Sequence, residues 1–186
     1  MKKINSKGFT LIELLAVITI LGILMLVAIP AVSRTIENSR RDTYADLGKT
    51  YIRTVRNAVI ADELKCGDQS VSATTAGTYY FKISTVSGGT GAQQTTDIME
   101  KGGKSSWGSN DVKGYVKWVK TAKTTGESGF TTDYYILLVD TGLHGIDVEK
   151  EENDVTRSNV HVKATQTKFD DVPQAPTGTA TECTLK

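Results

Sequence analysis

The apolar run FTLIELLAVITILGILMLVAIPAV, residues 9–32, decides the fold. About 20 apolar residues are enough for a helix to cross a bilayer, and the single charged side chain in this longer run is Glu13. The preceding residues MKKINSKG carry three lysines and no acidic residue, a bias that places the N-terminus in the cytoplasm. No small-x-small cleavage site closes the run, as one would in a secretory signal peptide. We therefore expect a retained, single-pass membrane helix.

Two residues inside this run are poor helix formers. Relative to alanine, Gly22 costs a helix roughly 1 kcal/mol and Pro30 roughly 3 kcal/mol, and proline also removes one backbone hydrogen bond. Together they bracket the segment Ile23–Ile29. We expect this bracketed segment to leave the helix more easily than its neighbours.

Composition and motifs argue against an enzyme or a nucleic-acid-binding protein. The net charge of the 186 residues is +1, so no basic footprint for nucleic acid is present. The sequence contains no nucleophile elbow, phosphate loop or H-E-x-x-H motif. His144 and His161 are its only histidines, and we expect both at the surface or packed rather than ligating. We predict no catalytic residue, no metal site and no cofactor.

The two cysteines, Cys66 and Cys183, are too far apart for a C-x-x-C redox or zinc motif. In an exported domain the simplest prediction is one disulfide between them. The alternative is a pair of unpaired buried thiols. A disulfide that closes so long a loop contributes on the order of 4–5 kcal/mol in the chain-entropy account.

The string KGFTLIELL, residues 7–15, resembles the processing site of a type IV prepilin, with Gly8 before Phe9 and Glu13 four residues later. The resemblance extends to about Pro30, and Gly22 and Pro30 fall where the family places helix breakers. It implies that a membrane-embedded prepilin peptidase cuts after Gly8 and N-methylates Phe9.

The same resemblance implies a function for the acidic residue. Glu13 lies about 6 Å along a helix from Phe9 at 1.5 Å per residue, so a subunit sliding by that distance would set its amine beside the Glu13 of a neighbour. The family implies a pilus homopolymer on the cell surface, built by a dedicated assembly machinery. A pseudopilin of a type II secretion or DNA-uptake apparatus shares the motif, and a membrane-anchored protein that never polymerises is a further alternative.

Beyond Val32 the sequence becomes polar but keeps a helical period. Apolar side chains recur on one predicted face, at Ile36, Tyr44, Leu47, Tyr51, Val55, Ala58 and Val59. We predict one helix from Phe9 to about Leu64, with Gly67 as its C-cap. The helix has no second proline after Pro30, although Gly48 would permit a mild bend.

The rest of the chain has the pattern of short strands between turns rich in Gly, Ser and Thr. The predicted strands are residues 78–84, 114–120, 133–139, 144–149 and 158–164, and the tail from 169 is expected to be irregular up to Cys183. The predicted fold is α+β and pilin-like: a long N-terminal helix packed against a C-terminal antiparallel sheet. The expected parts are a leader (1–8), a membrane or filament-core helix (9–32), an amphipathic helix (33–66) and a sheet domain (67–186).

We expect neither the acidic stretch 140–154 nor Trp107 to form a binding site. The stretch 140–154 holds six acidic residues, yet calcium needs six or more converging oxygen ligands, so a solvated charged loop is the preferred interpretation. Trp107 is expected to pack on the sheet rather than to bind a partner.

Overall fold

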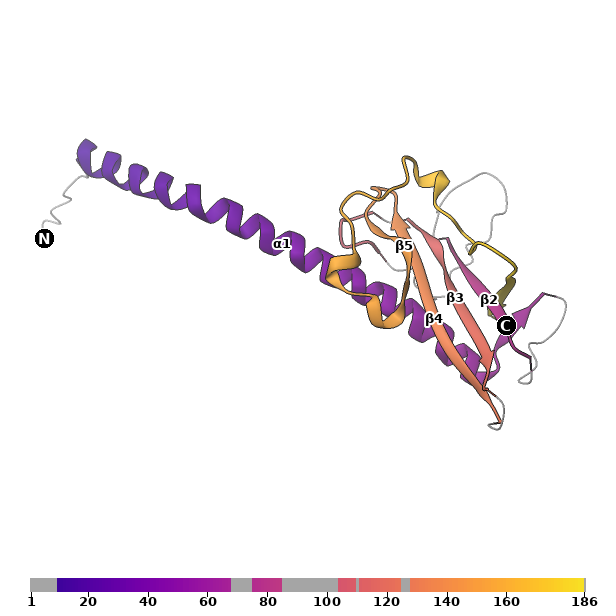
Figure 1. Ribbon diagram of the computed structural model, residues 1–186. Coiled ribbons are helices and arrows are strands. Elements are labelled where there is room, and N and C mark those ends of the chain that lie inside the picture. Colours follow the sequence, from indigo (N-terminus) through magenta and orange to yellow (C-terminus); the bar gives the residue numbers. More distant parts are fainter. Residues whose placement is uncertain (1–9, 68–74, 85–103, 110, 125–127, 186) are drawn as a thin grey trace, which may run out of the picture. The chain divides into compact units, whose positions relative to one another are not determined.

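A computed structural model describes residues 10–67, 75–84, 104–109, 111–124 and 128–185. Its first element is the helix α1, Leu11–Ala61 (Figure 1). The chain forms two units, residues 1–39 and 40–186, which are described separately. In the first unit the described part is helical from Leu11 onward, and Pro30 lies inside the helix.

In the second unit, which we call the head, the remainder of α1 is amphipathic. Its buried side is formed by Tyr44, Ala45, Gly48, Tyr51, Ile52, Val55 and Ala58. The side chains of Tyr51, Ile52 and Val55 are completely inaccessible to solvent. The spacing of these residues is the helical period that the sequence showed, so the predicted apolar face is confirmed from Tyr44 onward.

The end of α1 differs from the prediction. The helix stops at Ala61, and Asp62 takes the left-handed backbone conformation with φ 56°. The amide of Glu63 donates to Ala58 O and that of Asp62 to Val59 O, which is the hydrogen-bond pattern of a Schellman cap. The prediction that Gly67 is the C-cap was therefore wrong, because the chain leaves the helix earlier and residues 64–66 form a strand.

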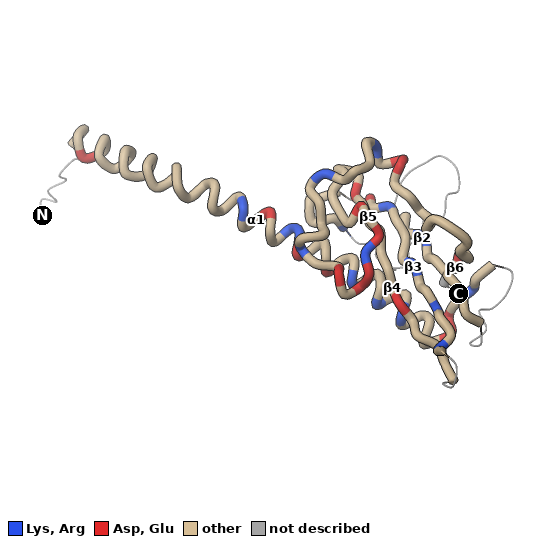
Figure 2. Tube along the Cα trace, in the orientation of Figure 1, with Lys and Arg blue, Asp and Glu red and all other residues tan. Residues whose placement is uncertain are grey.

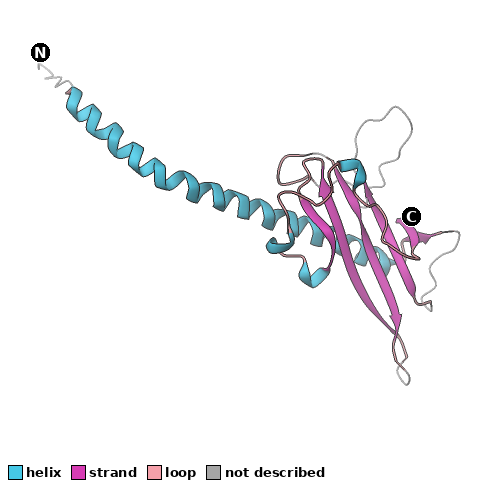
Figure 3. Ribbon diagram, turned by 45° about the horizontal axis from the view of Figure 1, so that its top comes forward, coloured by secondary structure: helices cyan, strands magenta, loops and turns pink. Residues whose placement is uncertain are grey.

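The described residues of the head form one sheet of six strands, which is drawn in magenta in Figure 3. They are β1 (Leu64–Cys66), β2 (Gly77–Ser84), β3 (Val112–Ala122), β4 (Phe130–Asp140), β5 (Gly145–Glu151) and β6 (Thr181–Leu185). Their spatial order is β1-β6-β2-β3-β4-β5. All neighbours are antiparallel except β2 and β6, which are parallel. The predicted α+β arrangement of a long helix with a C-terminal sheet is confirmed.

Each face of the sheet has its own apolar cluster. On one face, Phe81, Val116 and Ile136 belong to the cluster that also contains the buried side of α1 in the head. On the other face, Tyr115, Leu137 and Val139 pack with Ala164 and Val172 from the irregular segment before β6. The helix and the C-terminal segment therefore cover opposite faces, which explains why the central strands β3 and β4 are buried on both sides.

The predicted strand at 158–164 was wrong. Residues Arg157–Asn159 form a single 3₁₀ turn, and beyond it His161 makes only an isolated bridge to Gly145. This segment pairs with β5 only at Gly145, the first residue of the strand, instead of extending beside it. The short strands β1 and β6 were missed as well, because β1 has three residues and β6 follows a Pro- and Thr-rich stretch without alternation.

Close backbone packing explains two glycines of the head. A Cβ at Gly114 would lie 1.9 Å from the carbonyl oxygen of Leu137, and one at Gly48 would lie 3.0 Å from Ile146 Cδ1. Gly114 thus permits β3 and β4 to approach, and Gly48 lets α1 pack closely on β5. Close packing on the sheet, rather than the mild bend considered above, accounts for Gly48.

Candidate functional site

The first part of α1 presents an apolar surface that the described residues of its own unit do not cover. Large apolar side chains exposed there include Leu11, Ile12, Leu14, Leu15, Ile18, Leu24, Leu26, Val27 and Ile29. Figure 2 shows this part of the helix almost free of charged residues. Of the helices that the structure describes, α1 alone is long and apolar enough to cross a membrane. A contiguous apolar surface of this size needs lipid or other protein to cover it.

The acidic residue of the apolar run has a local partner at the start of α1. One oxygen of Glu13, Oε2, accepts from the backbone amide of Thr10 at 2.9 Å and from its hydroxyl at 2.7 Å. In return the amide of Glu13 donates to Thr10 Oγ1 at 3.3 Å. This reciprocal arrangement is a capping box, which satisfies amides that the first turn of a helix leaves without partners. This local role was not predicted above, although the T-x-x-E spacing indicates it.

The remaining residues of the predicted processing and assembly site are placed as follows. Gly8 and Phe9 lie outside the described residues. Apart from its neighbours in the helix, no described residue lies within 4 Å of where a Cβ of Gly22 would stand. Pro30 is helical, and α1 is assigned as one element through Ile23–Ile29. The expected loss of helix in this segment concerns the assembled state and stays a prediction.

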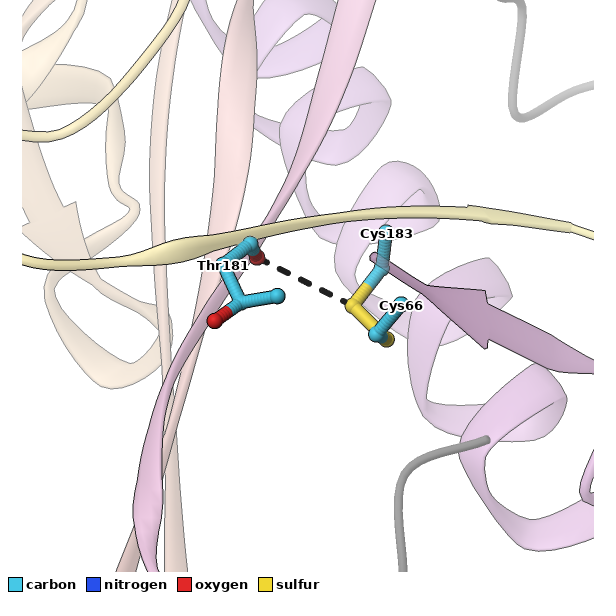
Figure 4. Close-up of a disulfide and its surroundings, with 3 residues drawn as sticks. All are labelled: Cys66, Thr181 and Cys183. Carbon is cyan, nitrogen blue, oxygen red and sulfur yellow. Dashed lines mark hydrogen bonds between the residues drawn. A yellow bond between two sulfur atoms is a disulfide. The ribbon is translucent and has the colours of Figure 1, made fainter. Parts of the chain in front are cut away.

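Cys66 and Cys183 are joined in a disulfide (Figure 4). The bond connects directly opposed residues of β1 and β6, and both cysteines lie in the buried cluster on the helix side of the sheet. It links the strand that follows α1 to the strand at the end of the chain. The described residues contain no free cysteine.

Charged pairs fasten the segment after β5 to α1. Arg157 donates to both carboxylate oxygens of Asp42, and Arg56 donates to Glu152 while lying 4.8 Å from the ring centre of Tyr134. The hydrogen bond from Arg157 lowers the pKa of Asp42. These contacts hold the turns of residues 152–159 against the helix within the head.

The acidic stretch 140–154 is not a solvated loop throughout, so that preferred interpretation was wrong for two of its acids. Asp140 and Asp147 are buried, and each is paired with one of the two histidines. His144 Nδ1 lies 3.0 Å from Asp140 Oδ1, and His161 Nδ1 lies 2.5 Å from Asp147 Oδ1. Among the described residues no group of three potential ligands is placed to hold a metal ion.

The further contacts of Asp140 and of its partner His144 are packing and hydrogen-bonding contacts within the head. Asp140 also accepts from the hydroxyl of Ser105 and the amide of His144, and the ring of His144 stacks on Trp107 with centroids 4.7 Å apart. Trp107 in turn contacts Tyr44 of α1. Trp107 is also packed against the buried cluster that contains the helix and sheet side chains, so its predicted packing is confirmed.

Asp147 has a shifted pKa. Burial by itself raises this pKa, but the hydrogen bonds from the Thr165 amide and from His161 outweigh burial, and the pKa lies below its ordinary value. A carboxylate held in this way is ionised at neutral pH.

Comparison with known protein families matches residues 3–29 to the prokaryotic N-terminal methylation motif. The matched region covers the predicted cleavage position, Glu13 and most of the apolar run. Comparisons with curated proteins and with solved structures return no match. The motif and the apolar helix that continues from it fit an N-terminal membrane anchor. Residues 3–29 thus carry the class III signal that type IV pilins present to prepilin peptidase.

Proposed function

We propose that this chain is the structural subunit of a type IV pilus filament. Prepilin peptidase cuts between Gly8 and Phe9 and methylates the new amine of Phe9. The pilus assembly machinery then extracts the subunit from the membrane into a homopolymer on the cell surface. The observation that carries the proposal is the methylation motif at residues 3–29, which is continuous with the uncovered apolar surface of α1.

The apolar surface supports extraction into a filament. In the membrane, lipid covers the side chains of residues 11–32, and in a filament the helices of neighbouring subunits take over that cover. Because both environments are apolar, transfer need not expose the helix to water. Extraction still requires external work, which the assembly machinery supplies.

Glu13 supports assembly through the oxygen that the capping box does not occupy. Thr10 engages Oε2 only, so Oε1 is left to accept the methylated amine of a neighbouring Phe9. An acid in hydrocarbon is costly, and removing one partner of a buried ion pair typically costs about 3–5 kcal/mol. The pair would therefore fix the register of subunits along the filament.

Mass spectrometry of the mature chain tests the processing step. We expect an N-terminal N-methylphenylalanine at position 9 in cells that contain prepilin peptidase. An intact Met1 or Lys2 terminus would refute the proposal. Electron microscopy of purified fibres in which this chain is the bulk component would distinguish a pilus subunit from a pseudopilin.

Three variants separate the charge of Glu13 from its capping role. Glu13→Ala removes both, whereas Glu13→Gln keeps a side chain that serves in a capping box and removes only the charge. Thr10→Val keeps the charge and removes the hydroxyl. We expect all three to be processed, and both Glu13 variants to assemble few fibres. Normal fibres from Glu13→Gln would show that the charge does not set the register.

The helix-breaking pair gives a second test in the filament. We expect residues 23–29, between Gly22 and Pro30, to lose helical hydrogen bonds on assembly, because both bracketing residues weaken the helix. A filament map with continuous helix through Pro30 would contradict this expectation.

A further inference from the structure

We propose that the Cys66–Cys183 disulfide is a redox-dependent latch on the C-terminal strand, and that its reduction allows β6 to exchange with β6 of a second copy of this chain. The latch concerns the head alone and does not depend on filament formation.

The position of β6 in the sheet makes it the closing element. It lies between β1 and β2, which precede it by more than a hundred residues, and it pairs with three residues of each. Among the described strands β1 has no other neighbour. Removing β6 therefore leaves β1 without a strand partner and opens the backbone edge of β2 at Tyr79–Phe81.

The chain before β6 can redirect this strand without moving the buried side chains that precede it. The last buried side chain ahead of it is Val172, and residues 173–180 contain no helix or strand and are exposed or part-exposed. Eight residues span up to about 26–29 Å when extended, at 3.3–3.6 Å per residue. This segment is the hinge that a strand exchange needs.

A second copy of the chain is the occupant that fits the vacated edge. Its residues 181–185 reproduce each contact of the original strand: Glu182 accepts from the hydroxyl of Tyr80 at 3.1 Å, and Cys183 stands opposite Cys66. Exchange of an identical element between protomers costs little because the same contacts form again. An unrelated peptide would not restore the pair of opposed cysteines.

The latch works by ordinary thiol–disulfide exchange. A dithiol such as dithiothreitol supplies two electrons and two protons, becomes a cyclic disulfide and leaves Cys66 and Cys183 as thiols. In the reverse direction, oxidised glutathione accepts the electrons. One protein thiolate forms a mixed disulfide and releases glutathione, and the other thiolate then displaces the second glutathione.

Both cysteines are buried in the closed head, with 4% and 2% of their surface accessible, so pairing between two chains requires β6 to move.

Two single-cysteine chains test the exchange directly. The full-length chains Cys66→Ser and Cys183→Ser, one of them size-tagged, are mixed in detergent micelles with a reduced and oxidised glutathione buffer. Non-reducing electrophoresis and mass spectrometry then detect joined peptides. We expect a mixed dimer linked from Cys66 of one chain to Cys183 of the other, at least tenfold more abundant than any dimer from either variant alone. An absence of the mixed dimer, or equal amounts in all three samples, would overturn the proposal.

Hydrogen exchange on the wild-type chain keeps the test independent of the variants' folding. Dithiothreitol is expected to accelerate amide exchange in the peptide that contains Tyr79–Phe81 by tenfold or more, and to leave the β3–β4 pairing around Val116 and Ile136 unchanged. Equal exchange in the oxidised and reduced chain, or an equal rise throughout the head, would contradict a latch confined to β6.

Discussion

Asp42 in α1 and Arg157 in the turn after β5 form a bidentate ion pair, although they lie 115 positions apart in the sequence. Together with the pair of Arg56 and Glu152 it holds the segment 152–159 on the helix. Val155 and Val160, within and just after this segment, are completely buried. The charged contacts thus border buried apolar side chains, and both kinds of contact fix the segment that follows β5.

Substitution of Asp42 by Asn should weaken this attachment. Arg157 lowers the pKa of Asp42, and a lowered carboxyl pKa gives stability that is present above the unfolded-state value and is lost as pH falls through the folded-state value. We expect a small decrease in the urea midpoint at pH 7 that disappears in acid, because exposed pairs contribute little. The charge-swapped chain Asp42→Arg, Arg157→Asp is the control. If it is no more stable than the single Asp42→Arg chain, the pairing does not act as described.

Gly48 should tolerate a methyl group and little more. Gly48→Ala gains about 1 kcal/mol of helix propensity, but its Cβ would meet Ile146 Cδ1 at 3.0 Å, so we expect almost no net change in the free energy of unfolding. Gly48→Leu is expected to cost about 1–3 kcal/mol through overpacking. Denaturant unfolding of both variants measures the difference. Equal stability of the Leu variant and the wild type would show that α1 is not closely packed on β5.

Asp147 should make the head sensitive to acid. Its hydrogen bonds from Thr165 and His161 outweigh the opposing effect of burial and lower its pKa, so its stabilising effect is complete above the unfolded pKa near 3.9 and declines as pH falls through the lower, folded value. Asp147→Asn should lose about 1–3 kcal/mol at pH 7, as expected when a buried hydrogen-bond network loses one partner. Urea midpoints between pH 7 and pH 2 test this. A variant whose deficit stays constant down to pH 2 would argue against the carboxylate as the titrating group.

Thr10 should control the order of the first helical turn. Loss of an N-cap hydroxyl costs about 0.5–2 kcal/mol of helix stability, so Thr10→Val is expected to fray residues 11–13 in detergent micelles. Thr10→Ser retains the hydroxyl and serves as the matched control. Amide exchange at Ile12 and Glu13 by nuclear magnetic resonance reports the effect. Identical protection in the Val and Ser variants would mean that the hydroxyl bond to Glu13 does not stabilise the turn.

Local patterns predicted the elements whose signals lie within a few consecutive residues. The apolar run and the helical period from Tyr44 to Ala58 predicted α1, and alternation with aromatic residues predicted β2, β3, β4 and β5. The spacing of Gly8, Phe9 and Glu13 indicated the processing motif. These features were readable because helices and long strands repeat with a fixed period along the chain.

Features that depend on distant residues were missed. Nothing near residues 158–164 showed that they would pair with β5 at a single residue, because His161 is held by the buried Asp147 and by the backbone of Gly145. Likewise β1 and β6 are too short to show a period, and they are strands because each is the other's partner. The helix ended at Ala61 instead of Leu64 for the same reason, since β1 draws residues 64–66 into the sheet.

The sequence by itself thus determined the membrane-length helix, its processing motif and the α+β class, because apolar length, spacing and periodicity are properties of neighbouring residues. Only the tertiary structure decided which aspartates are buried with a histidine and which segment covers the face of the sheet opposite the helix. It also decided between which strands β6 is inserted in the sheet. Those outcomes depend on packing and charge contacts between residues far apart in the chain, for which no short stretch of sequence carries the information.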